Sequence, residues 1–107
     1  MNTKAALLQA LIRGEGYGLD LIARVRERTK GKVKIHQGNV YPTLRALEAE
    51  GLVRSYEADP LPERGGRPRR YYQLTPDGKK AAMDQTKAVA GLFGLVVALL
   101  GLGETAR

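Results

Sequence analysis

Glycine and proline divide this chain into short segments, and that division constrains the fold more than any other feature of the sequence. The glycines within residues 14–18, Gly31 and Gly51 each end a stretch with helical spacing, because glycine readily adopts the left-handed backbone found at helix ends. A stretch rich in proline, glycine and arginine, residues 58–68, separates two further segments. A single small domain of short elements is therefore expected from 107 residues.

Three helices are predicted in the first half of the chain. Residues 3–13 and 19–29 carry apolar side chains at helical spacing, namely Leu7, Leu8, Leu11 and Ile12 in the first and Leu21, Ile22 and Val25 in the second. The third helix is predicted over residues 38–50, with one face formed by Val40, Leu44 and Leu47. Pro42 falls in its first turn, where a missing amide costs little. The alternating residues 32–36 predict a very short strand just before this helix.

A β-hairpin and a long fourth helix are predicted in the second half. Residues 52–57 and 69–74 alternate, or nearly alternate, between polar and apolar side chains, which is typical of strands. Thr75, Pro76 and Asp77 then supply an N-cap, a first-turn proline and a first-turn acid. A helix is therefore expected to start there and to run to about residue 101.

This order of elements predicts a mainly α protein with a small β-hairpin, of the α+β class. It is the order of a winged helix-turn-helix domain, here residues 1–75, followed by a C-terminal dimerisation helix, here residues 76–107. Because a fold does not by itself give a function, the function has to be argued from charge and side chains.

The positive charge of the chain is confined to the predicted winged helix-turn-helix part. Residues 1–80 contain 16 of the 18 lysines and arginines and 9 of the 11 acids, so they carry the whole net charge of +7. A positive head with a neutral, apolar tail suggests that the head binds a polyanion and that the tail has another task. Many soluble proteins are basic without binding nucleic acid, so charge alone leaves that alternative open.

The outward face of the third helix has the chemistry of a DNA recognition helix. It carries no acid at its centre, and its side chains near the N-terminus can meet base edges in a major groove. Two alternatives remain, since Asn39 can instead cap the helix and Arg45 can pair with Glu48. The predicted DNA contacts on or just before this helix are Lys34, Gln37, Asn39, Tyr41, Pro42, Thr43 and Arg45.

The loop of the predicted hairpin is a basic wing. It carries Arg64, Arg67, Arg69 and Arg70 among glycines and a proline, which suits contact with the phosphate backbone or the minor groove. By itself this would be an ordinary solvated loop. Beside a recognition-like helix, we interpret the four arginines as DNA contacts.

The end of the fourth helix is apolar on almost every side, so one partner cannot cover it. We predict that it forms the interface of a homodimer, and the residues assigned to that interface are Leu92, Phe93, Leu95, Val96, Leu99 and Leu100. A membrane anchor is the main rival, because residues 88–103 carry no charge, but this stretch is shorter than the roughly 20 residues that span a bilayer. Burial within the monomer is the other alternative.

Several function classes are disfavoured by what the sequence lacks. Without cysteine there are no disulfides or thiolate metal sites, and no carboxylate pair, metal-ligand cluster or phosphate-binding glycine motif indicates an enzyme. No cofactor or metal is predicted. The major groove of duplex RNA is too deep and narrow for the third helix to read its bases, so RNA is a poor ligand. A winged helix that binds protein would not need a basic wing. The N-terminus lacks the apolar core of a secretory signal, so a cytoplasmic location is expected, with no membrane partner.

Three sequence blocks resemble the PadR family of bacterial regulators. They are GYGLDLI at residues 16–22, GNVYPTLRALE and EGLV within residues 38–53, and GRPRRYYQLTPDG at residues 66–78. The resemblance implies a homodimeric repressor whose third helix enters successive major grooves of a pseudo-palindromic operator. In the matched motifs, Tyr41 and Pro42 belong to that helix, and the basic positions of the wing are Arg67, Arg69 and Arg70.

The resemblance also implies that a small-molecule effector can release the protein from DNA. The tail after Gly78 is short, however, and the chain has no tryptophan to sandwich a flat aromatic ligand. Double-stranded DNA and a second copy of the chain are therefore the predicted partners, and an effector is a further one.

Overall fold

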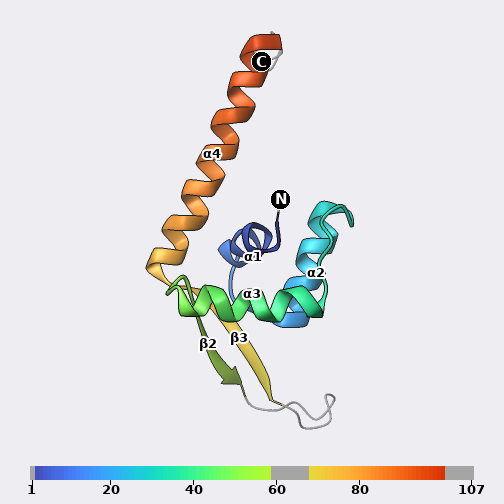
Figure 1. The fold of residues 1–107 in the computed structure, drawn as a ribbon, viewed down its shortest axis with the longest axis vertical. Coiled ribbons are helices and arrows are strands. Elements are labelled where there is room, and N and C mark those ends of the chain that lie inside the picture. The colour runs from blue at the N-terminus through green and yellow to red at the C-terminus, as the bar shows by residue number, and fades with distance from the viewer. Residues whose placement is uncertain (1, 59–67, 101–107) are drawn as a thin grey trace.

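The computed structural model describes residues 2–58 and 68–100 (Figure 1). Beyond residue 88 it describes only the side chains of Leu92 and Leu99. The elements in chain order are α1 (Thr3–Ile12), β1 (Gly16–Tyr17), α2 (Gly18–Thr29), α3 (Gln37–Ala49), β2 (Val53–Ala58), β3 (Arg69–Leu74) and α4 (Pro76–Leu100). The predicted α+β class is confirmed, with helices around one small sheet.

The ends of the helices follow from residues with known capping roles. Asn2 caps α1, because its Oδ1 accepts a hydrogen bond of 2.8 Å from the backbone N–H of Ala5. Helix α2 ends at Lys30, which has a left-handed backbone with φ of 53°, and Gly31 follows with φ of 77°. Gly51, with φ of 78°, ends α3 in the same region. The breaks predicted at Gly31 and Gly51 are therefore confirmed.

The sheet has three antiparallel strands in the order β1-β3-β2. The predicted hairpin is confirmed in β2 and β3, with Tyr56 opposite Tyr71. Strand β1 was not predicted: Gly16 lies opposite Tyr72 and Tyr17 opposite Tyr71. The sheet therefore joins the wing to the residues that immediately precede α2.

The strand predicted over residues 32–36 is wrong. The carbonyl of Ile35 accepts a hydrogen bond of 3.1 Å from the Arg26 guanidinium of α2, so this backbone is held by a helix and not by a strand. Ile35 is buried in the core and Val33 packs against that core. The alternating pattern reflects the packing of Val33 and Ile35 against the core from an irregular segment.

All four helices contribute to a single hydrophobic core. The largest fully buried side chains are Leu7, Leu21, Val40, Leu44, Leu47 and Val53, and Tyr72, Leu74 and Ala82 complete the core toward the sheet and α4. Ala82 is wholly buried, so the first turns of α4 belong to the same packed unit as α1. The rest of α4 projects from this unit, which accounts for the extents of 56 × 27 × 25 Å (Figure 1). Within the described ranges, no helix is long and apolar enough to cross a membrane.

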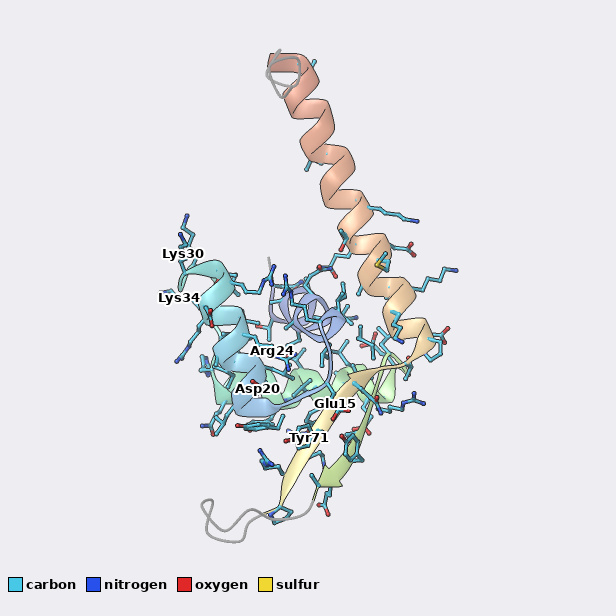
Figure 2. All side chains as sticks on the ribbon, turned by 180° about the vertical axis from the view of Figure 1, so that it is seen from behind. Glu15, Asp20, Arg24, Lys30, Lys34 and Tyr71 are labelled. Carbon is cyan, nitrogen blue, oxygen red and sulfur yellow. The ribbon has the colours of Figure 1, made fainter. Side chains whose placement is uncertain are left out.

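Arg24 of α2 fixes the turn that carries β1. Its guanidinium donates four hydrogen bonds of 2.6 to 3.2 Å, to the carbonyls of Ala10, Gly14 and Glu15 and to the carboxylate of Asp20. Figure 2 shows Arg24 close to Asp20, between the first two helices. Because the donors bind both sides of the turn, Arg24 determines where β1 lies relative to α1 and α2.

The start of α4 is locked to the turn after α3. The Thr75 hydroxyl donates to the Gly51 carbonyl (2.6 Å) and accepts from the Gly78 N–H (3.0 Å), as an N-cap does. The Thr75 N–H donates to the Leu52 carbonyl (3.1 Å). Gly78 packs so closely on this turn that a Cβ there would overlap the Leu52 carbonyl oxygen. No residue larger than glycine fits at position 78 without moving the helix.

Candidate nucleic-acid interface

The side chains of His36 and Asn39 form hydrogen bonds with the backbone around the start of α3. His36 Nδ1 accepts a hydrogen bond of 3.1 Å from the Gly38 N–H. Asn39 accepts from the His36 N–H (2.9 Å) and donates to the Lys34 carbonyl (3.2 Å). Asn39 therefore caps the helix, which is the alternative to base contact that its residue type allows, and His36 has a structural role. Together they fix the direction in which the N-terminus of α3 points.

The first three turns of α3 have an exposed outward face that carries no acid. Gln37, Pro42 and Arg45 are exposed, and the sequence from Gln37 to Leu47 contains no aspartate or glutamate. The alternative pairing of Arg45 with Glu48 does not occur, since the Glu48 carboxylate accepts a hydrogen bond of 2.8 Å from Ser55. Arg45 makes no ion pair within residues 2–58 and 68–100. Its guanidinium is therefore available to a ligand.

Tyr41 and Thr43 are only half-buried, and both have partners within the protein. The Tyr41 ring lies against the backbone of Gly18, where a Cβ would overlap the ring. The Thr43 hydroxyl donates to the Asn39 carbonyl (2.7 Å). Tyr41 thus joins α3 directly to the start of α2, the element that follows β1.

Two lysines are exposed at the ends of the segment that leads from α2 to α3. Lys34 is exposed one residue before Ile35, and Lys30 is exposed at the end of α2. Figure 2 places both on the same side of the molecule. Neither forms an ion pair with any residue that the structure describes. This positive charge adds to the partial positive charge of the α3 N-terminus.

Arg70 lies on the side of the sheet that faces α3. Its guanidinium donates to the Ser55 hydroxyl (3.0 Å) and to the Glu57 carboxylate (3.2 Å), and Ser55 in turn donates to Glu48 at the end of α3. The Arg70–Glu57 pair is exposed at both ends, so it holds Arg70 only weakly. A phosphate is therefore able to replace Glu57 as its partner.

Arg69 points to the opposite side of the sheet. Its guanidinium lies 5.1 Å from the ring centroid of Tyr17 and 5.3 Å from that of Tyr71. Tyr71 also stacks on Tyr56, with centroids 5.7 Å apart and ring planes 15° apart. We call Tyr17, Tyr56 and Tyr71 the outer tyrosine cluster. Arg64 and Arg67, the other two predicted wing contacts, lie outside the described residues.

A contact that sequence reasoning missed joins the outer tyrosine cluster to the turn before β1. The Tyr56 hydroxyl donates a hydrogen bond to the Glu15 carboxylate, and this bond raises the pKa of Tyr56 above its ordinary value. Glu15 and Tyr71 lie on the same side of the sheet in Figure 2. The available signal was the hairpin register, which places Tyr56 opposite Tyr71, whereas nothing in the sequence near Glu15 indicated its partner.

An apolar cavity lies between α1, α2 and α4, close to where α4 leaves the core. Its volume is about 460 Å³, and it is lined by Ala6, Gln9, Ala10, Ile12, Arg13, Arg24, Val25, Arg28, Thr29, Met83 and Thr86. Ile12 and Met83 are 41% and 50% exposed. Of the predicted dimer residues, Leu92 and Leu99 are 65% and 77% exposed. The side chains of Phe93, Leu95, Val96 and Leu100 lie outside the described residues.

Helices α1, α2 and α3, a β-hairpin joined by the short strand β1, and an exposed surface on α3 without acids between Gln37 and Leu47 define a winged helix-turn-helix protein. Residues 7–84 match the Transcriptional regulator PadR-like family. The chain therefore belongs to the Transcriptional regulator PadR-like family. The prediction from the three sequence blocks is confirmed.

Individual relatives agree with this family. The chain is similar to the transcriptional regulator Rv3488 of Mycobacterium tuberculosis, with 34% identity over 63% of this chain and 59% of that protein. A PadR family transcription regulator of Clostridium difficile has the same fold, with a TM-score of 0.74 and 23% identity over 92% of this chain and 97% of its own. Bacillus subtilis PadR, solved in complex with operator DNA, gives a TM-score of 0.68 and 26% identity over 78% of this chain and 45% of its own.

Proposed function

We propose that this chain binds double-stranded DNA as a homodimer and represses transcription from a pseudo-palindromic operator. The exposed surface that Gln37, Pro42 and Arg45 form on α3, with no acid between Gln37 and Leu47, is the observation that carries the proposal. A relative from Bacillus subtilis has been solved in complex with operator DNA, which supports the same class of ligand here. A cytoplasmic location goes with this proposal, because the ligand would be chromosomal DNA.

The side chains of α3 suit the major groove. A helix fits that groove when its outward face is slim and does not repel phosphate. Arg45 has the donors to bind the O6 and N7 atoms of guanine, and Gln37 has the amide to bind adenine. Between Gln37 and Arg45, the small side chains of Pro42 and Thr43 keep the outward face of α3 narrow. We assign base contact to Gln37 and Arg45, and positioning of the helix to Asn39.

Other residues of the interface are assigned to the phosphate backbone. Lys34 and the N-terminus of α3 suit one phosphate strand, and Arg70 suits the strand on the wing side. Tyr41 has a hydroxyl beside the start of α2 and is assigned a phosphate hydrogen bond. Arg64 and Arg67 are proposed for the wing from sequence alone.

The homodimer is proposed to form through α4. Leu92 and Leu99 are exposed on a helix that projects from the core, and an apolar cavity with Ile12 and Met83 in its wall lies at the base of that helix. An exposed apolar helix and an exposed apolar cavity on one molecule cover each other in a two-fold dimer. A dimer of this kind presents two copies of α3 to two half-sites.

A small-molecule effector remains a prediction of the same proposal. The cavity between α1, α2 and α4 is the site we would assign to it, where it would compete with the partner's α4 for apolar surface. Repression and effector release both come from family membership and not from this geometry.

Replacing Arg45 with alanine tests the assignment of α3. We expect operator binding to weaken by about 1–3 kcal/mol, with relaxed preference at one base pair, because a bidentate contact to guanine is lost. Binding of the variant is measured by fluorescence anisotropy on the operator and on operators with single base changes.

Arg54→Ala is the matched control for this experiment. Arg54 is also exposed, but it lies on β2 facing the same side of the sheet as Tyr56, away from α3. Its removal should leave the base preference unchanged. Equal losses in both variants on every duplex would assign Arg45 to general charge and contradict base recognition by α3.

A further inference from the structure

We propose that Arg69 is a positioning residue of the wing, which clamps β3 to β1 by stacking on Tyr17 and Tyr71 and does not bind phosphate. Its consequence for DNA affinity rests on the proposed function, whereas the clamp itself does not. This assignment separates Arg69 from Arg70, although the two are neighbours in a basic stretch.

The contacts of Arg69 already occupy its guanidinium. The two ring centroids lie 5.1 and 5.3 Å away, within the range of a cation–π interaction, and the rings of Tyr17 and Tyr71 meet edge to face at 5.6 Å. The Nε atom is shielded from solvent and has no hydrogen-bond acceptor among the residues described. A cation held in this way gains more from the rings than an exposed one, because water competes less for it.

Strand geometry directs Arg69 away from the proposed DNA side. Successive side chains of a strand point to opposite faces of the sheet. Arg70 shares its face with the buried Tyr72 and bonds to Ser55, which is bonded to α3. Arg69 therefore shares the other face with Tyr71, behind the sheet as seen from α3.

The clamp connects the wing to the recognition helix. Strand β1 has only two residues, so its backbone pairing with β3 is short. Gly18 follows β1 directly, and its backbone packs against the Tyr41 ring of α3. A second contact, from Tyr56 to Glu15, joins β2 to the same turn. Arg69 thus adds a side-chain contact to a two-residue pairing that sets the position of the wing relative to α3.

The test uses the single variants Arg69→Gln, Arg69→Lys and Tyr17→Leu, and the double variant that combines Arg69→Gln with Tyr17→Leu. Arg70→Gln is the matched control. In the free protein, we expect each variant at Arg69 or Tyr17 to speed amide hydrogen exchange in β1 and β3 by about 3- to 30-fold, the factor that corresponds to a cation–π contact. The effect of the double variant should be smaller than the sum of the two single effects, because both substitutions remove the contact between Arg69 and Tyr17. Arg70→Gln should leave exchange in β1 unchanged, because the printed contacts of Arg70 are with β2.

Operator binding across a salt series supplies the second measurement. Arg69→Gln and Tyr17→Leu should both weaken binding and leave the dependence of log K on log salt unchanged, and Arg69→Lys should not restore the affinity. Arg70→Gln should reduce the salt slope by about 1, as loss of a phosphate contact does.

Two results would overturn the proposal. One is unchanged exchange in the free Arg69 and Tyr17 variants. The other is a salt slope reduced by about 1 in Arg69→Gln and restored in Arg69→Lys, with no effect of Tyr17→Leu, which identifies a phosphate ligand. If the unsubstituted protein binds no DNA, the proposed function fails, and the exchange measurement still decides whether the clamp exists.

Discussion

Replacing Gly78 with alanine should destabilise the folded protein by about 3 kcal/mol, a large effect for the addition of one methyl group. The new Cβ would overlap the Leu52 carbonyl oxygen, which is backbone and cannot rotate away. Relief requires α4 to move off the turn, and that movement breaks the hydrogen bonds of Thr75 to Gly51 and Leu52. Urea unfolding followed by circular dichroism, at one fixed protein concentration, measures the loss.

Gly91→Ala is the matched control, because Gly91 lies in the same helix with open space around its α-carbon. The usual preference of helices for alanine should make this variant more stable, by about 0.5–1 kcal/mol. Opposite signs for the two substitutions are therefore expected. Similar small effects at both positions would mean that the start of α4 is not packed on the turn after α3.

Replacing Leu92 and Leu99 together with glutamate should convert the protein to a monomer and weaken operator binding about 100-fold or more. Both side chains are largely exposed in the single chain, so folding of the monomer should survive. In the proposed dimer each glutamate would be buried without a partner, which strongly disfavours association. A monomer binds one half-site at a time and loses the gain from binding two together.

Sedimentation velocity and operator anisotropy measure the two effects on the same samples. Lys87→Glu, on an exposed position of the same helix, controls for the added negative charge. It should remain a dimer and lose little affinity. A double glutamate variant that stays dimeric would contradict the assignment of α4 to the interface, and a monomer that still binds the operator tightly would contradict the need for two half-sites.

Local patterns in the sequence predicted the helices and the hairpin well. The spacing of Val40, Leu44 and Leu47 identified the buried face of α3, and Gly31 and Gly51 marked helix ends that indeed have positive φ. These features depend on neighbours within a turn of helix or on the backbone of one residue. They can therefore be recognised without tertiary structure.

The features that were missed depend on contacts between distant residues. Strand β1 is too short to alternate, and it forms because Arg24 holds the preceding turn next to the free edge of β3. The alternation over residues 32–36 was misleading because it comes from burial and not from strand pairing. Ile35 is buried, but its segment pairs with no strand within the described residues. A two-residue strand cannot be seen in a sequence until its partner edge is known.

In the candidate site, too, features set by local sequence were predicted and features set by contacts between distant residues were not. Exposure of Gln37 and Arg45 on α3 follows from helical geometry. The stacking of Arg69 on Tyr17 does not, because β1 brings the two together from opposite ends of the domain. A run of arginines was interpreted as one basic surface, whereas the pleat of β3 sends Arg69 and Arg70 to opposite faces.

Anisotropy titration of the purified protein against the promoter fragment upstream of its own gene, compared with a scrambled duplex over a salt series, tests whether the protein recognises operator DNA as a dimer. We expect binding that prefers the promoter by at least about 1,000-fold, weakens steeply as salt rises and saturates at two chains per site. Weak and equal binding to both duplexes at every salt concentration would contradict it. That result would leave a basic winged helix-turn-helix protein that does not recognise this DNA sequence.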